Sequence, residues 1–379
     1  MQYSPLHYGS NVCRSEVRTT RLSAHGYCWN MTSTLSWPEM LERLLAGGNL
    51  SVAEASSAMN QVISGEISSA QLAAFLVALR AKGESVDEVL GFREAVLAQA
   101  VPLTVDRDAV DIVGTGGDHH KTVNISSTAA IICAAAGVPV LKHGNRAASS
   151  SSGSSDVLAE LGIPLDQTPA DVQRVFADLG IGFAFAAAHH PGFRHAGPTR
   201  VELGIPTVFN ILGPLCNPAR PRAAALGVAS LERVGLIVGV LQSSDVSGLV
   251  FRGDEGLDEL STCGHSRIWE ISRGQVFEHD FDPRSVGIQL ATLDDIRGGS
   301  PAQNAQTIRD VLSGSTGAVR DVVCLNAAAG LVSFDLLSHP DHSQRPIVDR
   351  ISDGLTLAYE TIDSGRAFAK LNAWIAATN

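Results

Sequence analysis

The segment 111-DIVGTGGDHHKTVNISS-127 joins a short apolar run to three glycines within four residues, an aspartate and several hydroxyl and amide side chains. Glycines let a backbone approach a ligand that a Cβ would block, and exposed backbone N–H groups before a helix attract anions. The dinucleotide pattern GxGxxG is not met, because His119 occupies the last position, and the phosphate-loop pattern GxxxxGK[ST] is absent. The segment therefore predicts either a phosphate site or a structural tight turn.

A second polar loop follows the next apolar run, 138-VPVLK-142. Lys142 is followed by His143, Asn145, Arg146 and the serine-rich stretch 149-SSSSGSS-155. Such a stretch alone is typical of a flexible linker. Its place between an expected strand and an expected helix instead favours a mobile loop, whose cations and hydroxyls suit closure over a multiply phosphorylated substrate.

The acidic stretch 253-GDEGLDELS-261 carries four carboxylates within six residues. Hard cations prefer oxygen ligands, and magnesium usually needs only one or two carboxylates together with phosphate oxygens. The alternative is a solvated acidic turn. The two polar loops favour magnesium, because a pyrophosphate-bearing substrate arrives with that ion.

The segment 189-HHPGFRHAGPTRVELGIPTVFNILGPLCNP-218 holds three histidines, but neither a helical HExxH pattern nor a Cys/His spacing typical of zinc. It also holds Arg194 and Arg200. A guanidinium can bind a planar carboxylate through two hydrogen bonds, so these arginines are candidates for recognising an organic acid.

Four helices are expected between residues 36 and 100. The first has an apolar stripe of Trp37, Leu41, Leu44 and Leu45. Each helix is preceded by a capping-box pair, namely Ser36 with Glu39, Ser51 with Glu54, Ser68 with Gln71, and Ser85 with Glu88. Because no strand pattern separates them, they predict a small all-helical domain.

After Pro102 the pattern alternates between strands and helices. Strands are expected at 110–113, 138–142, 181–186, 223–228, 247–253 and 266–272, and helices at 125–137, from a cap at Asp156, at 301–312 and at about 350–375. This alternation predicts an α/β domain whose central, mostly parallel sheet is flanked by helices. Ligands bind such sheets at the carboxyl ends of the strands, where both polar loops fall.

The composition is that of a soluble globular protein, with 45% hydrophobic and 18% charged residues among 379. A net charge of −11 argues against general nucleic-acid binding, although a local pocket can still be positive. The six cysteines are far apart, which favours a reduced, cytoplasmic chain.

Three parts of the chain are expected. Residues 1–30 lack both a helical period and the apolar core of a secretory signal, and are expected to be a disordered extension or to precede a real start at Met31. The helical domain is assigned to 31–103, joined in space by roughly 193–215. The α/β domain is assigned to 104–379.

Four ordered motifs carry a family resemblance: GTGGD-x₃-T-x-N-x-S, KHGNRAxSS-x-SG-x-x-D, R-x-ELGIPTVFN-x-LGPL-x-NP and GLDE. In this order they resemble the anthranilate phosphoribosyltransferases, which catalyse the second step of L-tryptophan biosynthesis. The resemblance runs from about Trp37 to the C-terminus. It implies binding of anthranilate and 5-phosphoribosyl 1-pyrophosphate (PRPP), two Mg²⁺ ions per subunit and a cytoplasmic homodimer.

The resemblance also implies site residues. Those expected around PRPP are Gly114, Gly117, Asp118, Thr122, Asn124, Ile125, Ser126, Ser127, Lys142, Asn145, Arg146, Ser149, Ser150 and Ser154. Those expected at anthranilate are Gly114, Asn145, His190 and Arg200, with His143 close by. The expected magnesium ligands are Ser126, Asp258 and Glu259. Gly192-Phe193 and Ser155 depart from the residues usual in the family, and the first departure could alter the route by which anthranilate enters.

The implied reaction is attack of the anthranilate amine on C1 of the ribose while pyrophosphate leaves. An aryl amine is a neutral nucleophile at pH 7, so no strong general base is required. The catalytic assignments are therefore Lys142, which offsets charge on pyrophosphate, Arg200, which orients anthranilate, and His143 as an optional proton acceptor.

Two alternatives remain open on the sequence alone. A pyrimidine nucleoside phosphorylase shares this architecture but does not need GLDE or the Arg200 segment. A regulatory PRPP-binding protein without catalysis would not need the acidic pair Asp258 and Glu259.

Overall fold

The computed structural model describes residues 35–146 and 152–379. The expected extension 1–30 and the expected PRPP contacts Ser149 and Ser150 lie outside the described residues. The chain from 35 onward forms one compact unit. It begins with four helices, α1 (Trp37–Leu45), α2 (Val52–Ser64), α3 (Ser69–Lys82) and α4 (Val86–Ala98).

The capping pairs begin these N-terminal helices as expected. The side chains of Ser51, Ser68 and Ser85 each accept a hydrogen bond from the backbone N–H three residues later, at 3.2–3.3 Å. Side-chain caps satisfy backbone donors that the first helical turn leaves unpaired. The expected stripe of α1 is partly wrong, because Met40 is buried in place of Leu45, which is 71% exposed.

A seven-stranded sheet follows, in the order β3-β2-β1-β4-β5-β6-β7. The strands are β1 (Val110–Gly114), β2 (Val140–Gly144), β3 (Ile181–Phe185), β4 (Ala223–Gly227), β5 (Ser247–Gly253), β6 (Ser266–Ser272) and β7 (Gln275–Phe281). The pairings from β3 through β5 are parallel, and those of β6 with β5 and β7 are antiparallel. The expected fold class, an all-helical N-terminal domain with a mostly parallel α/β sheet, is confirmed.

Eleven further α-helices are described. They are α5 (Ile125–Ala135), α6 (Ser154–Glu160), α7 (Pro169–Leu179), α8 (Ala186–His189), α9 (Gly197–Leu203), α10 (Phe209–Leu215), α11 (Leu231–Ser243), α12 (Pro301–Leu312), α13 (Ala318–Ser338), α14 (Ile347–Asp363) and α15 (Arg366–Thr378). Short 3₁₀ turns are η1 (Pro191–His195), η2 (Pro283–Val286) and η3 (Pro340–Gln344).

Two expected helices are corrected. Asp156 is not an N-cap, because α6 begins at Ser154 and the Asp156 carboxylate accepts from the N–H of Gly153 at 3.0 Å. The single helix expected at about 350–375 is two helices, since Gly365 adopts a left-handed conformation with φ 78° between α14 and α15.

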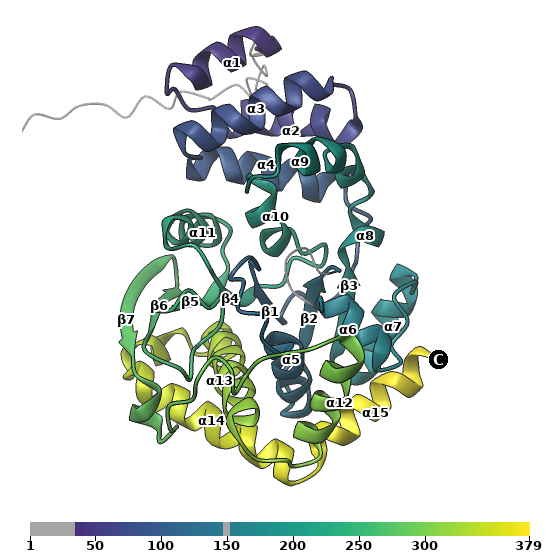
Figure 1. The fold of residues 1–379 in the computed structure, drawn as a ribbon, viewed down its shortest axis with the longest axis vertical. Coiled ribbons are helices and arrows are strands. Elements are labelled where there is room, and N and C mark those ends of the chain that lie inside the picture. Colours follow the sequence, from purple (N-terminus) through teal and green to yellow (C-terminus); the bar gives the residue numbers. More distant parts are fainter. Residues whose placement is uncertain (1–34, 147–151) are drawn as a thin grey trace, which may run out of the picture. The chain divides into compact units, whose positions relative to one another are not determined.

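The two faces of the sheet belong to different cores. On β4, Ala223 and Ala225 pack in a core with α5, α13 and α14, whereas Ala224 and Leu226 pack in a core with the N-terminal helices and α11. Side chains alternate across a strand, so both faces of these buried strands are apolar. Figure 1 shows α5, α13 and α14 on one side of the sheet and α10 and α11 on the other.

Helix α13 is long and apolar enough to cross a membrane by length and composition. Within the fold, 72% of the most apolar stretch of this helix is buried. It contacts α5, α14 and strands of the sheet, which is the environment of a core helix.

Candidate active site

Lys142 and His143 lie at the carboxyl end of β2, next to the end of β1. Both side chains are 2% exposed. The Lys142 ammonium donates to the backbone oxygen of Ile112 on β1 and to Ser126 Oγ, at 3.1 Å, in the first turn of α5. Two expected site residues, one on β2 and one on α5, are therefore in direct contact.

The surroundings of Lys142 are strongly acidic. Burial lowers the pKa of Lys142, and the charges of Asp111, Glu259 and Asp258 oppose that shift. Opposite charges nearby favour the charged form of an amine. The lysine thus provides the positive charge in a buried group of carboxyls.

Asp258 and Glu259 face this lysine from the loop after β5. Each residue is 8% exposed. Burial, followed by repulsion from Asp118, raises the pKa of Asp258 to about 7, while the N–H of Gly116 donates to its Oδ2 at 2.6 Å. Burial and the charge of Asp258 raise the pKa of Glu259 well above its usual range. Carboxyls that repel one another in a buried site are suited to binding a cation.

Two glycines allow the acidic loop to approach the strand ends. A Cβ on Gly114 would lie 2.2 Å from Asp258 Oδ2, and a Cβ on Gly227 would lie 1.6 Å from the backbone oxygen of Asp258. Neither contact is possible for a side chain. Glycine at both positions therefore determines where the Asp258 carboxylate lies.

Gly227→Ala is expected to lower the free energy of unfolding by about 1–3 kcal/mol, since the neighbour is backbone that must shift. Gly235→Ala is the matched control: it lies within α11 and a Cβ there would meet nothing within 4 Å. The control is expected to raise stability by about 0.5–1 kcal/mol. Urea unfolding of both variants tests the pair, and equal effects would contradict the close approach at Gly227.

The glycine loop leads from β1 into α5. Gly116 and Gly117 have φ of 69° and 84°, which residues with a Cβ rarely adopt. The loop is held at its far end, because the N–H of Val123 donates to the oxygen of Ile296 at 3.0 Å and Thr122 forms a bridge with Arg297.

Asn124 is held by a residue that the sequence did not single out. Buried Asn304 donates from Nδ2 to Asn124 Oδ1 at 2.8 Å, and its own Oδ1 accepts from the N–H of Gly299 at 2.7 Å. Asn124 in turn donates to the oxygen of Ser152 at 3.1 Å. Asn304 belongs to the segment 298-GGSPAQNA-305, to which no role was assigned from the sequence.

Two expected PRPP contacts on α5 have buried side chains. Ile125 and Ser127 are each 2% exposed, and Ile125 packs in the core. The backbone N–H of Ser127, in the first turn of an eleven-residue helix, remains as a contact for an anion, whereas the N–H of Ile125 donates to the oxygen of Val123 at 2.7 Å. Ser126 between them is half-buried and accepts from Lys142.

Asn145, directly after β2, contacts the first residues of α6. The backbone oxygen of Asn145 accepts from Ser154 Oγ and from the N–H of Ser155, both at 3.3 Å. Arg146 is exposed and lies 3.5 Å from a carboxylate oxygen of Asp156. Asn145 and Arg146 thus present polar side chains at the edge of the site.

Ring contacts connect Arg200 with His143. The Arg200 guanidinium lies 5.1 Å from the Phe209 ring, Phe209 lies 5.4 Å from Phe193, Phe193 lies 5.4 Å from His190, and His190 lies 5.2 Å from His143. Aromatic pairs at these centroid distances attract one another. The 189–218 segment therefore places its aromatic residues beside the lysine-bearing strand.

The two histidines each keep one unpartnered nitrogen. His143 Nδ1 is 2.9 Å from the oxygen of Gly213, and His190 Nε2 is 2.8 Å from the oxygen of Cys216. Carbonyl oxygens only accept, so these nitrogens carry the protons. His143 Nε2 and His190 Nδ1 are buried acceptors without a partner among the described residues. Burial lowers the pKa of His143 to about 3 and that of His190 to about 4.

Arg200 is half-buried, and burial lowers its pKa. It forms no ion pair with any residue that the structure describes. Arg194, from the same segment, is exposed, and among the described residues it donates to its neighbour His195 at 3.4 Å. Arg200 is therefore the better candidate for binding an organic carboxylate.

Gly192, the departure noted above, has a packing reason. A Cβ there would lie 2.7 Å from the backbone oxygen of Ile63 on α2. Together with His190 and Phe193 it lines a small cavity against α2 and α4. Another cavity, of about 340 Å³, lies elsewhere and contains no expected site residue; it is lined by Leu231, Arg252, Asp254, Arg267 and Trp269.

Asp111 and Asn217 form a buried network that sequence reasoning missed. Asp111 accepts from the N–H of His143 at 3.1 Å and from Asn217 Nδ2 at 2.9 Å, and Asn217 also donates to the oxygen of Leu141 at 2.8 Å. Burial raises the pKa of Asp111 to about 6, which the charge of Lys142 opposes. The network fixes the backbone of β2 at the catalytic candidates.

Asp111→Ala is expected to lower the free energy of unfolding by about 1–3 kcal/mol, since the buried N–H of His143 loses its acceptor. Asp108→Ala is the control: its carboxylate pairs with Arg222 at 2.7 Å on the surface, and exposed pairs contribute about 0–1 kcal/mol. Denaturant unfolding compares them. A smaller effect at Asp111 than at Asp108 would contradict a structural role for the network.

Comparisons with known proteins identify the family of this chain. Residues 38–100 match a family described as "Glycosyl transferase family, helical bundle domain", and residues 106–368 match "Glycosyl transferase family, a/b domain". The anthranilate phosphoribosyltransferase of Leifsonia xyli is 61% identical over 348 residues, covering 92% of this chain and all of the relative.

Two solved structures are similar throughout. The anthranilate phosphoribosyltransferase of Thermus thermophilus is 39% identical with a TM-score of 0.81, covering 89% of this chain and 98% of that one. The enzyme of Saccharomyces cerevisiae in complex with PRPP and Mg is 26% identical with a TM-score of 0.79, covering 90% and 97%. On this identity, coverage and fold, the chain belongs to the anthranilate phosphoribosyltransferase family.

Proposed function

We propose that the buried lysine and carboxylates at the ends of β1, β2 and β5 carry out the family's reaction in this chain. That reaction transfers the 5-phosphoribosyl group from PRPP to the amine of anthranilate, giving N-(5-phosphoribosyl)anthranilate and pyrophosphate. The observation that carries the proposal is the group formed by Lys142, Ser126, Asp258 and Glu259. Its one cation and several carboxyls are buried together around the glycine loop.

Ser126, Asp258 and Glu259 would hold magnesium, as two ions per subunit. Their fit to a hard cation rests on the raised pKa values of Asp258 and Glu259, because a bound cation would relieve the repulsion that raises them. When bound, magnesium supplies positive charge to the phosphate oxygens. The yeast relative was solved with PRPP and Mg, which supports the assignment.

Lys142 and the backbone donors of the glycine loop and α5 would stabilise the charge on departing pyrophosphate. These donors are already in place before the reaction, which lowers the cost of reorganisation. Asp118, Thr122, Asn124, Arg146 and Ser154 would complete the PRPP site. Asn304 acts on that site by orienting Asn124.

Arg200 and Asn145 would position anthranilate so that its amine faces C1 of the ribose. The new N–C1 bond forms as the C1–oxygen bond to pyrophosphate breaks, and the amine then loses a proton to solvent. His143 Nε2 is a free acceptor close to Lys142, but its low pKa of about 3 makes it a weak base. We therefore assign it a hydrogen bond to the amine, with His190 as its neighbour.

The division into a helical domain of residues 31–103, joined by roughly 193–215, and an α/β domain of 104–379 is part of the proposal. In support of joining roughly 193–215 to the helices, Phe209 and Leu212 pack in one core with Phe75 and Phe92.

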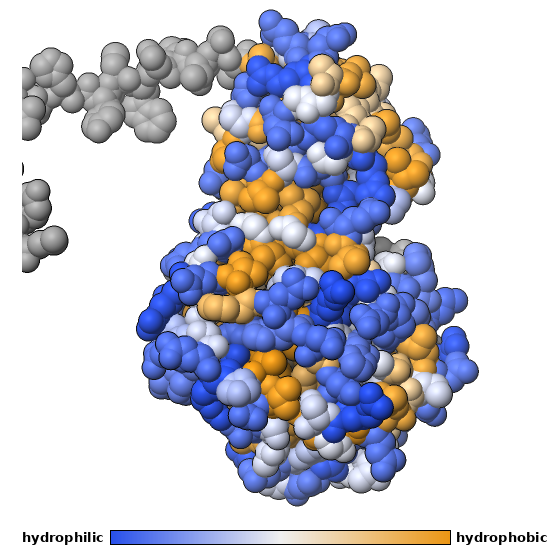
Figure 2. All heavy atoms as spheres, turned by 90° about the vertical axis from the view of Figure 1, so that its left-hand side faces the viewer, coloured by the Kyte–Doolittle hydropathy of each residue, from blue (hydrophilic) through white to orange (hydrophobic). Residues whose placement is uncertain are grey.

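We also assign a cytoplasmic homodimer. Hydrophobic side chains exposed on α1, α3, α9 and the residues after α9 would suit a second copy; they are Leu45, Val77, Val201 and Ile205. Large exposed apolar patches mark contact surfaces. On the face drawn in Figure 2, hydrophobic groups interrupt the hydrophilic surface over the helices near the top.

An assay of pyrophosphate release tests the proposed function. Purified protein is expected to release pyrophosphate from PRPP only when anthranilate is present, and to leave thymidine with inorganic phosphate unchanged. Phosphorolysis of thymidine would instead indicate a nucleoside phosphorylase. Binding of PRPP without turnover would indicate a regulatory protein.

A further inference from the structure

Asp335, His339 and His342 form a cluster at the end of α13, apart from the residues assigned above. Asp335 and His339 are four residues apart on one helix, a spacing that places both side chains on the same face. His342 follows in η3, whose turn brings it back to the same carboxylate. Among the described residues, this is the one group of three or more histidines, cysteines and acids close enough to share an ion.

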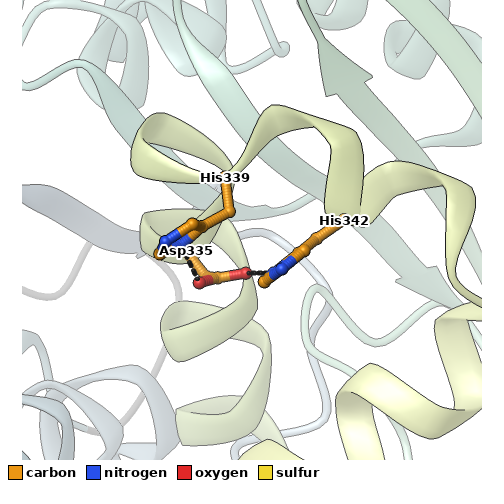
Figure 3. Close-up of side chains that lie close together, drawn as sticks. All are labelled: Asp335, His339 and His342. Carbon is orange, nitrogen blue, oxygen red and sulfur yellow. Dashed lines mark hydrogen bonds and ion pairs between the residues drawn. The ribbon is translucent and has the colours of Figure 1, made fainter.

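The carboxylate of Asp335 joins the two imidazoles. His339 Nδ1 lies 2.8 Å from Asp335 Oδ1, and His342 Nδ1 lies 2.6 Å from Oδ2. The rings are stacked, with centroids 4.8 Å apart and planes at 17°. Figure 3 shows both rings directed at the carboxylate.

The backbone that carries the cluster is well anchored. The N–H of His339 donates to the oxygen of Asp335 at 2.8 Å, and the N–H of His342 donates to the oxygen of His339 at 2.9 Å. Ser272, on β6, donates to the oxygen of Pro340 at 3.2 Å. The three side chains therefore project from fixed positions although each is partly exposed.

One ligand atom from each residue lies within 4.8 Å of those of the other two. Around a tetrahedral zinc ion with bonds of about 2.0–2.2 Å, ligand atoms are roughly 3.5 Å apart, so small side-chain rotations suffice. Two imidazoles and a carboxylate are a donor set of zinc and of the later first-row metals, whereas magnesium prefers oxygen alone.

We propose that Asp335, His339 and His342 bind Zn²⁺ or a similar late first-row divalent cation, with solvent completing its coordination. The site is separate from the magnesium site at Asp258 and Glu259 in both its ligands and its preferred metal. The ion would replace the hydrogen bonds between Asp335 and the histidines by bonds to metal, and would link the end of α13 to η3.

Zinc binding to the whole chain, measured by calorimetry in saturating Mg²⁺, tests the site. Magnesium occupies the oxygen-rich site, so that zinc reports on the imidazoles. The wild type is expected to bind one more equivalent of zinc than His339→Ala or His342→Ala, or to bind zinc at least about tenfold more tightly. Loss of a residue that only supports a metal ligand already weakens metal binding about 10–100-fold.

His265→Ala is the matched control. His265 lies 3.2 Å from Asp280 and 3.5 Å from Asp282, so it also pairs with carboxylates but offers a single imidazole. It is expected to keep the wild-type zinc affinity. Asp335→Asn provides a second test that leaves both histidines in place, and circular dichroism checks that each variant is folded.

The proposal is overturned if wild type and the folded His339→Ala variant bind zinc with equal affinity and stoichiometry, or if His265→Ala loses as much binding as His339→Ala. Cobalt gives an independent readout. A visible absorption band typical of nitrogen-ligated Co²⁺ is expected for the wild type in saturating Mg²⁺ and not for His342→Ala. The same band in both proteins would contradict the assignment.

Discussion

Asp258→Asn combined with Glu259→Gln is expected to abolish the response of turnover to magnesium and to lower kcat/KM by on the order of 10²–10³, the size of losing a preorganised electrostatic contact. Both side chains keep their size but lose the charge that a hard cation requires. Initial rates measured over a range of magnesium concentrations give the result directly.

The fold of this double variant is expected to be at least as stable as that of the wild type. A carboxyl whose folded pKa lies above its unfolded value destabilises the fold increasingly as pH rises above the unfolded pKa, and to the full extent above the folded pKa. Asp258, with a pKa of about 7, is such a group, and the amide removes that penalty.

Asp254→Asn controls for general effects of charge in the same turn. Asp254 is exposed, and its replacement is expected to leave the magnesium response unchanged. If the double variant retains wild-type stimulation by magnesium, the acidic loop is not the metal site.

Arg200→Ala is expected to raise the KM for anthranilate roughly ten- to a hundredfold while leaving the KM for PRPP nearly unchanged. A hydrogen bond to a charged group contributes about 1.5–3 kcal/mol, which corresponds to that range of affinity. Arg200 is half-buried and without an acidic partner among the described residues, so its guanidinium is available to a carboxylate. Steady-state kinetics with each substrate varied in turn measure both constants.

Arg200→Lys is expected to recover little, because an ammonium cannot make the two-pronged contact. Arg194→Ala is the control, since this arginine comes from the same segment but is exposed. A rise in the KM for PRPP with that for anthranilate unchanged would place Arg200 in the phosphate site instead.

Much of the fold could be predicted because its signals are local. A capping box is recognised from two residues three positions apart, and each strand of the parallel sheet is a continuous apolar run in the sequence. The seventh strand, β7, was missed because its side chains are largely exposed. Its connection to β6 also lacks a usual signal, since Arg273 with φ 49° precedes Gly274 with φ 70°, where Asn-Gly would be typical.

The candidate site residues could be predicted where they lie in short local motifs, such as the glycine loop, the polar loop after β2 and the acidic stretch that holds Asp258 and Glu259. Asp111, Asn217 and Asn304 act through partners 32–180 residues away, and no local pattern reports such pairings. Leu45 is a further example, because it fits the apolar period of α1 but finds no partner in the fold that would bury it among the described residues. Periodicity identifies a hydrophobic face, but it does not say whether the same chain covers it.

The core that Ala224 and Leu226 share with the N-terminal helices has a practical consequence for dividing this enzyme. The two domain families match separate parts of the chain, residues 38–100 and residues 106–368. Phe75 and Phe92 nevertheless belong to the same apolar cluster as Leu226 and Val250 of the sheet. Cutting the chain near residue 103 would expose to solvent the hydrophobic side chains that each piece now buries against the other. Neither fragment is therefore suited to expression, domain exchange or crystallisation on its own, because each would lack part of the shared core.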